Sequence, residues 1–397
     1  MKLGAVGGSG NLGGVGSGLN RRIMCELVPS LSRRQRKLCD NHPDLIRAVF
    51  QGAQRGVSEC QYQFKGQRWN CSTLHQAHAA NAARLGRVML KLGSREASFV
   101  YAISSAGVVH AVARTCTQGG VSECACDHTK RGTGSDVKGS FLWGGCSDNL
   151  RYASRFARRF VDAQDRKSSD PMALMNLHNN RAGRAAVRRT MQRQCKCHGV
   201  SGSCATRTCW KAVGPFHKVG GFLFRKYQKA QQVRTHQNGK SLIPAATSTS
   251  RVQYDSVLSQ GSTTQATNKI RAWKSNRSKS RVVRRTDLVF FEPSPDYCVT
   301  DPRTGSLGTA GRRCNKTSTG ADNCDIMCCG RGYDTTTERV TYKCHCRFIW
   351  CCEVECKVCT EIRQVYTCKA ASAPPVEPSY PFRRGPYLFP SDQEAFN

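Results

Sequence analysis

Residues 195–210 read CKCHGVSGSCATRTCW and bring four cysteines, one histidine and two serines into sixteen positions. These residue types could support three kinds of chemistry. Thiolates and an imidazole can bind zinc, a serine can act as a nucleophile, and paired cysteines can staple a loop that presents one side chain. The spacing of the residues distinguishes these hypotheses.

A zinc site needs ligands that converge tetrahedrally, and its cysteines are commonly separated by two to four residues. Here the first pair is C-x-C, whose side chains point to opposite faces of an extended strand, and His198 directly follows Cys197. Nested pairing of Cys197 with Cys204, and of Cys195 with Cys209, explains the spacing better. It predicts a doubly stapled β-hairpin without a metal.

The run Gly199-Val200-Ser201-Gly202-Ser203 is close to the G-x-S-x-G pattern of serine hydrolases, but it lacks the glycine two residues after Ser201. Such an enzyme also needs a base held by a carboxylate, and a stapled hairpin tip offers no pocket for that pair. The segment therefore predicts no catalytic residue. Two interpretations stay open, a turn whose serines satisfy backbone groups or a site that displays a hydroxyl.

The cysteines also describe the organisation of the chain, which has 24 of them in 397 residues. Twelve lie between Cys25 and Cys209 and twelve between Cys298 and Cys368, which predicts two separately stapled domains. Disulfides in this number are typical of proteins that fold in an oxidising compartment, so we expect a secreted protein. The N-x-[ST] triplets at Asn70, Asn276 and Asn315 are candidate glycosylation sites and agree with secretion.

The charge of the chain is strongly positive, with 61 Lys and Arg against 27 Asp and Glu, a formal +34. Such an excess indicates a polyanionic partner. Because the cysteines indicate an oxidising environment, we favour the sulfated glycans of the cell surface and matrix over nucleic acid. A merely solvated basic face is the simpler alternative.

Hydrophobic spacing predicts an α+β fold whose first domain is helical. Residues 41–64 carry apolar side chains at helical spacing, and residues 95–116 are apolar over most of their length, as in a buried central helix. Ser169-Asp170-Pro171 is a helix start, and the basic helix that follows runs directly into the hairpin at 195–209. The helices therefore position that hairpin.

Composition divides the chain into five parts. Residues 1–24 are a glycine-rich leader without a continuous apolar signal segment, expected to be disordered, and 25–224 form the helical domain. Residues 225–287 are a basic Ser- and Thr-rich insert. Residues 288–369 are a small domain of cysteine-rich β-hairpins in which disulfides replace a core, and 370–397 are a proline-rich tail expected to be disordered.

Several motifs, taken together, resemble the Wnt family of secreted, lipid-modified signalling proteins. They cover 25–369 apart from the insert, and they include CKCHGVSGSCATRTCW (195–210), ECQYQFKGQRWNCS (59–72), WGGCSDN (143–149), HNNRAGR (178–184), GRGYDT (330–335) and CHCRFIWCCEVECKVC (344–359). The resemblance implies a non-enzymatic ligand of the Frizzled cysteine-rich domain that activates Wnt signalling. It also implies low-density-lipoprotein-receptor-related co-receptors, the carrier Wntless and heparan sulfate proteoglycans as partners.

The resemblance implies that Ser201 carries a palmitoleate added by the acyltransferase Porcupine, with no other cofactor. It implies a second receptor contact at a hairpin tip made by Phe348, Ile349, Trp350 and Val354, with a bond between the adjacent Cys351 and Cys352. Trp350 is the expected anchor, unless it only covers nearby disulfides. A basic matrix or heparin-binding structural protein without receptor activity is the alternative function.

The resemblance also implies a disulfide pairing that the spacing alone does not determine. In the first half the pairs are Cys60–Cys71, Cys116–Cys124, Cys126–Cys146, Cys195–Cys209 and Cys197–Cys204, with Cys25–Cys39 paired by elimination. In the second half they are Cys298–Cys329, Cys314–Cys324, Cys328–Cys368, Cys344–Cys359, Cys346–Cys356 and Cys351–Cys352.

Overall fold

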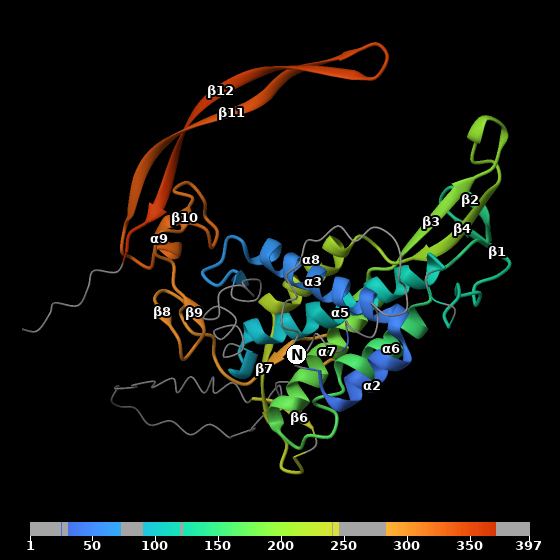
Figure 1. The fold of residues 1–397 in the computed structure, drawn as a ribbon, viewed down its shortest axis with the longest axis horizontal. Coiled ribbons are helices and arrows are strands. Elements are labelled where there is room, and N and C mark those ends of the chain that lie inside the picture. The colour runs from blue at the N-terminus through green and yellow to red at the C-terminus, as the bar shows by residue number, and fades with distance from the viewer. Residues whose placement is uncertain are drawn as a thin grey trace, which may run out of the picture.

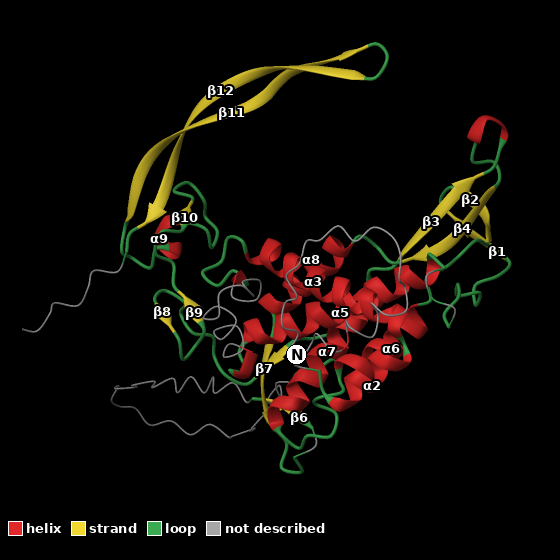
Figure 2. Ribbon diagram, viewed as in Figure 1, coloured by secondary structure: helices red, strands yellow, loops and turns green. Residues whose placement is uncertain are grey.

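The computed structural model describes residues 25, 31–72, 90–119, 121, 123–239, 241–245 and 283–370. These residues form a helical body that carries two long β-hairpins, whose tips lie above the body in the view of Figure 1. The leader before Cys25, the tail after residue 370 and Asn276 lie outside the described residues. The predicted α+β class is confirmed (Figure 2).

In the described part of the chain, six helices build the body. They are α2 (Arg33–Asn41), α3 (Pro43–Phe64), α5 (Arg95–Thr117), α6 (Leu150–Val161), α7 (Pro171–Arg189) and α8 (Phe216–Gln228). Four of them, α2, α5, α6 and α7, begin at side-chain caps. At α5, for example, Ser94 accepts a hydrogen bond from the backbone of Ala97, and at α7 Asp170 accepts one from Met172. Pro171 is the first residue of α7, as the sequence predicts.

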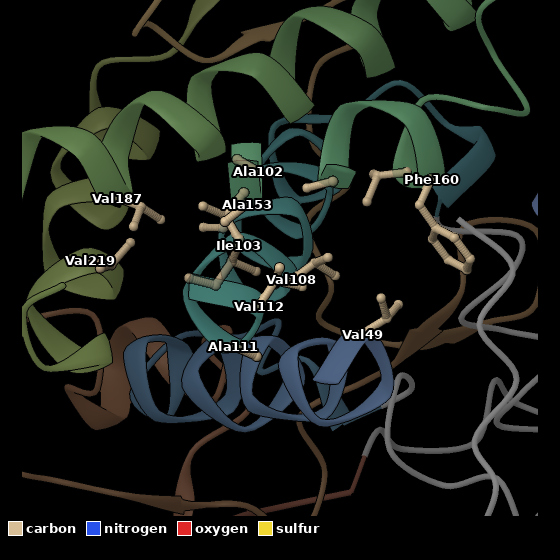
Figure 3. Close-up of a cluster of buried hydrophobic side chains, with 14 of the residues drawn as sticks. Val49, Ala102, Ile103, Val108, Ala111, Val112, Ala153, Phe160, Val187 and Val219 are labelled. Carbon is tan, nitrogen blue, oxygen red and sulfur yellow. The ribbon is translucent and has the colours of Figure 1, made fainter. Parts of the chain in front are cut away.

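The core of the body surrounds α5, which is buried along almost its whole length. Figure 3 shows Ile103, Val108 and Val112 of this helix among side chains of the helices around it. Among the described residues, α5 is the one helix long and apolar enough by composition to cross a membrane, and its apolar window lies wholly inside the protein. The prediction of a buried central helix is confirmed.

Glycines let neighbouring helices approach α5 closely. A Cβ atom on Gly52 of α3 would lie 2.4 Å from the carbonyl oxygen of Gly107, and one on Gly183 of α7 would lie 1.9 Å from that of Ala102. No side chain fits at these positions, so backbone packs directly on backbone. A buried bidentate ion pair, Arg184 with Asp162 at 2.9 Å, joins α7 to the end of α6.

The first hairpin, here called the thumb, spans 192–212 and consists of β3 (Gln192–Cys197) and β4 (Arg207–Ala212) joined through a short helical turn, η2 (Val200–Gly202). A smaller hairpin of β1 (Thr133–Asp136) and β2 (Gly139–Trp143) completes its four-stranded sheet, in the order β1-β2-β4-β3. Because β2 pairs in parallel with β4, a segment far away in the sequence supports the thumb.

The C-terminal region is built around a second hairpin, here called the finger, which spans 333–368. Its strands β11 (Tyr333–Ile349) and β12 (Glu353–Cys368) are antiparallel, and β10 (Arg313–Cys314) pairs with β12 at the base. Three short elements complete the region, namely β8 (Thr300–Asp301), β9 (Ser306–Leu307) and α9 (Cys324–Met327). The small core of this region consists of Cys324, Met327, Cys328 and Cys368, so disulfides do replace apolar packing here.

The boundaries predicted for the insert are wrong at both ends. Helix α8 continues past residue 224 to Gln228, and the chain then forms β5 (Gln231–Thr235) and β6 (Leu242–Pro244). β7 (Val289–Phe290) pairs with β5, and the preceding Leu288 is fully buried in the core of the body. The apolar residues of β5, β6 and β7 lie among polar residues in the sequence, so the composition of the segment did not reveal that they belong to the helical body. Residues 246–282 lie outside the described residues.

The structure forms eleven of the twelve expected disulfides. Every cysteine from Cys25 to Cys209 is paired as expected, including the Cys25–Cys39 pair that was assigned by elimination. In the finger region five pairs form in the same way. The expected Cys351–Cys352 bond is not formed, because the two sulfur atoms lie 4.0 Å apart. The tip instead turns through the backbone, with φ of 74° and 85° at these two residues.

Candidate functional site

Two disulfides staple the thumb, as its spacing predicts. Cys195 and Cys209 lie directly opposite one another in the strand register, with their Cα atoms 4.1 Å apart. Cys197 and Cys204 close the loop nearer the tip. The four sulfur atoms are therefore committed to bonds with one another, and none is left as a thiolate for a metal.

Ser201 lies at the outermost turn of the thumb and is exposed. Its backbone has φ 55° and ψ 26°, a left-handed conformation that costs an L-residue about 1–2 kcal/mol. Backbone hydrogen bonds hold the turn, from Gly199 N to Ser203 O at 2.8 Å and from Gly202 N to Gly199 O at 2.9 Å. The neighbouring Val200 is 91% exposed. The turn therefore presents one hydroxyl and one apolar side chain on a fixed backbone.

Position 199 of this turn has no space for a side chain. A Cβ atom there would lie 1.9 Å from the Ser203 hydroxyl oxygen and 2.6 Å from the Ser203 carbonyl oxygen. A backbone atom cannot move aside as a flexible side chain can, so only glycine allows the loop to close beneath Ser201.

An ionic cluster supports the sheet of the thumb, and the sequence did not reveal it. The buried side chain of Arg207 on β4 donates to the carboxylate of Asp136 on β1 and to the carbonyl of Gly139, at 2.7 Å for the latter. Arg193 on β3 also pairs with Asp136 and lies 4.6 Å from the centre of the Phe141 ring. This cluster, called the brace, ties the β1–β2 hairpin to both strands of the thumb.

The brace is also an electrostatic unit. The hydrogen bond from Arg207 lowers the pKa of the Asp136 carboxyl below its ordinary value, and the positive charges of Arg193 and Arg207 add to this effect. Asp136 therefore stays ionised at neutral pH. Because the charged form is the one that Arg207 binds, the ion pair between the two hairpins does not depend on pH near neutrality.

The finger presents the second group of expected contact residues. Trp350 is 92% exposed at its tip, and the adjacent Phe348, Ile349 and Val354 are all exposed apolar side chains. Phe348 and Val354 are cross-strand partners, so they lie on one face. Because Trp350 is so exposed, it does not cover the nearby disulfides.

An apolar stripe continues along this face of β12 beyond the predicted residues. Val358 and Ile362 alternate in phase with Val354 and are 74% and 67% exposed. The run EVECKVCTEI carries this signal, because its aliphatic residues fall on every fourth position and so on one face of the strand. Disulfides Cys344–Cys359 and Cys346–Cys356 hold the two strands together beside the stripe.

Ser201 and Trp350 belong to separate arms, so the structure brings the predicted contact residues together as two tips and not as one pocket (Figure 1).

Of the candidate glycosylation sites, Asn315 is exposed. Asn70 is half-buried and lines a cavity of about 230 Å³ together with Tyr297 and Arg312 of the C-terminal region. Fold and site together define a disulfide-stapled protein with two arms whose tips carry exposed apolar side chains.

Comparison with known proteins shows which family this architecture is similar to. A model of the Wnt family matches residues 27–369. Human protein Wnt-2b is 50% identical over 352 residues, which are 89% of this chain and 81% of that protein. A chain in the solved structure of human WLS in complex with WNT8A is similar with a TM-score of 0.54 and 32% identity, over 88% of this chain and 98% of that one.

The chain therefore belongs to the Wnt family, and the predicted resemblance is confirmed. It is similar to Wnt-2b over most of its length. Members of this family are secreted signalling ligands, and the family is not one of enzymes. The two stapled arms are then the features that a signalling ligand offers to its partners.

Proposed function

We propose that this protein is a secreted ligand that binds the cysteine-rich domain of Frizzled receptors from two sides. The thumb contributes an acyl chain on Ser201, and the finger contributes Trp350 and its apolar neighbours. The observation that carries the proposal is that both tips are exposed, apolar and built on stapled hairpins. Such tips lose little conformational freedom on docking.

Ser201 is the residue proposed to carry the palmitoleate, which Porcupine would attach in the secretory pathway. The serine is exposed and its backbone is fixed, so an enzyme can reach its hydroxyl without unfolding the loop. The roughly fifteen chain carbons of a palmitoleate set an upper limit of about 12 kcal/mol for full transfer from water, at about 0.8 kcal/mol for each CH₂. Docking costs reduce the affinity that is realised.

An acyl chain in water needs a carrier, and we propose that Wntless serves this chain in that way. The support is the similarity to a chain in the structure of human WLS in complex with WNT8A. A low-density-lipoprotein-receptor-related co-receptor is proposed as a further partner at the cell surface. Both proposals follow from membership of the family.

The decisive experiment compares secreted wild-type protein with Ser201→Ala and Ser203→Ala. We expect mass spectrometry to find the acyl adduct on the 195–209 peptide of wild type and Ser203→Ala, and surface binding to the Frizzled domain to follow it. Ser203→Ala is a matched control two residues away in the same exposed loop. An unmodified wild-type peptide together with full receptor binding would refute the lipid part of the proposal.

A further inference from the structure

Two neighbouring helices of the body present a face that is unusually rich in arginine. Helices α6 and α7 each contain four arginines and no acidic residue. Of these eight side chains only Arg184 is buried, and the other seven are exposed. The core uses the apolar side of each helix, so the arginines are gathered on the solvent side. This surface plays no part in either arm.

Two of the exposed arginines are brought together by the ion pair that joins the helices. Arg158 lies one turn before Asp162, and Arg181 lies just under one turn before Arg184. Because Asp162 and Arg184 are locked to each other at 2.9 Å, the turns that carry Arg158 and Arg181 are held side by side. Their relative position is therefore a property of the rigid core.

A third arginine reaches the same place from a distant part of the sequence. The ring of His178 on α7, one turn before Arg181, bonds through Nε2 to the backbone oxygen of Asp287 at 2.9 Å. Arg285 lies two residues before Asp287 and is exposed. Three guanidinium groups, from α6, α7 and the segment that leads into β7, thus converge on one surface.

Nearby acids do not neutralise this cluster. Asp162 is committed to Arg184, and the carboxylate of Asp287 accepts from Lys226 at 2.8 Å. Within the described parts of the chain, neither Arg158, Arg181 nor Arg285 takes part in an ion pair.

The charges also act on one another. Partial burial, and then the positive charges of Arg285 and Arg158, lower the pKa of the Arg181 guanidinium. Arg181 still stays protonated, because the ordinary pKa of arginine lies far above neutrality. Like charges held together by the fold in this way are relieved by a bound anion.

We propose that Arg158, Arg181 and Arg285, extended along the two helices by Arg155 and Arg188, form a binding site for a sulfated glycan. Guanidinium forks suit the oxygens of oxyanions, which they can contact with two hydrogen bonds at once. Arg181 and Arg188 lie two turns apart, about 10 Å along α7, so the site is long enough for several anionic groups of a chain. A glycan, and not a nucleic acid, is inferred because eleven disulfides indicate an extracellular protein.

The inference rests on the secreted location in the proposed function but not on receptor binding or on Ser201. It is tested by elution of the full secreted protein from immobilised heparin with a sodium chloride gradient. The variant is Arg158→Gln/Arg181→Gln/Arg285→Gln. The control is Lys130→Gln/Arg131→Gln/Lys138→Gln, which removes the same charge from exposed residues of the β1–β2 region.

We expect the first variant to elute at lower salt and the control to elute close to wild type. The slope of log affinity against log salt should fall by about two to three, because each lost contact releases close to one counterion fewer. Binding to the Frizzled domain should not change in either variant. Equal shifts for the two variants would overturn the proposal, because binding would then follow net charge alone.

Two further measurements separate the remaining outcomes. If the triple variant is not secreted, arginine-selective chemical labelling of wild-type protein with and without heparin replaces it, and the three arginines should be protected. Labelling that heparin leaves unchanged would refute the site. Vesicles of phosphatidylserine and phosphatidylcholine should bind wild type and variant alike, and a loss on vesicles but not on heparin would assign the face to membranes instead.

Discussion

The tip of the finger offers the sharpest test of how this protein recognises a receptor. Trp350 is 92% exposed, so almost its entire side chain is available to a partner. A tryptophan buries up to about 150–250 Å², and at about 25 cal/mol for each Å² the limit is about 4–6 kcal/mol. Interface anchors retain about 2–4 kcal/mol of such a limit. Trp350→Ala should therefore weaken binding by about 30-fold to 1,000-fold.

The assay is surface binding of secreted, acylated protein to an immobilised Frizzled cysteine-rich domain. Ile362→Ala is the matched control, because Ile362 is also an exposed apolar residue of the finger but lies far from its tip. Both variants should unfold at the temperature of wild type, since neither side chain belongs to the core. Wild-type affinity in Trp350→Ala, or an equal loss in Ile362→Ala, would refute the reasoning about the tip.

Three further predictions concern the parts that support the arms. Gly199→Ala should lower acyl occupancy at Ser201 by mass spectrometry, because the added Cβ meets the carbonyl of the residue at 203; unchanged occupancy would contradict the turn geometry. Asp162→Ala should cost about 3–5 kcal/mol in denaturant unfolding by leaving Arg184 unpaired, whereas Asp162→Leu/Arg184→Met should be near neutral. Burial lowers the pKa of His110 below its ordinary value of 6.5, so the folded state resists its protonation. The contribution of neutral His110 to stability is therefore fully present above about pH 6.5 and is lost as the pH falls below that value. His110→Gln should make the unfolding temperature depend less on pH between pH 7.4 and 5.5.

Much of this fold could be predicted from the sequence because its signals are local. The length and apolar composition of residues 95–116 predict a buried core helix, and the C-x-C spacing at Cys195 indicates a disulfide across two strands. The same local spacing placed Ser201 at the apex of a stapled loop, whereas its role and the position of Trp350 at a hairpin tip were implied by the family resemblance.

Long-range contacts were the features that sequence reasoning missed. The brace depends on Asp136 and Arg207, which are 71 residues apart, and no local pattern distinguishes them from other charged residues. Leu288 was assigned to the wrong domain because its burial depends on helices far back in the chain. The Cys351–Cys352 bond was expected by resemblance, whereas the turn at the tip is made by backbone dihedral angles.

The small sheet that receives β7 has a consequence for how such a chain can change over time. β6 and β7 lie on either side of β5, so the two points where the chain leaves and re-enters this sheet are about 10 Å apart. Any segment that joins Pro244 to the region before β7 need only span this gap, and doubling its length costs about 0.6 kcal/mol. Descendants of one ancestral gene can therefore lengthen, shorten or rewrite the sequence between these points while both arms keep their geometry.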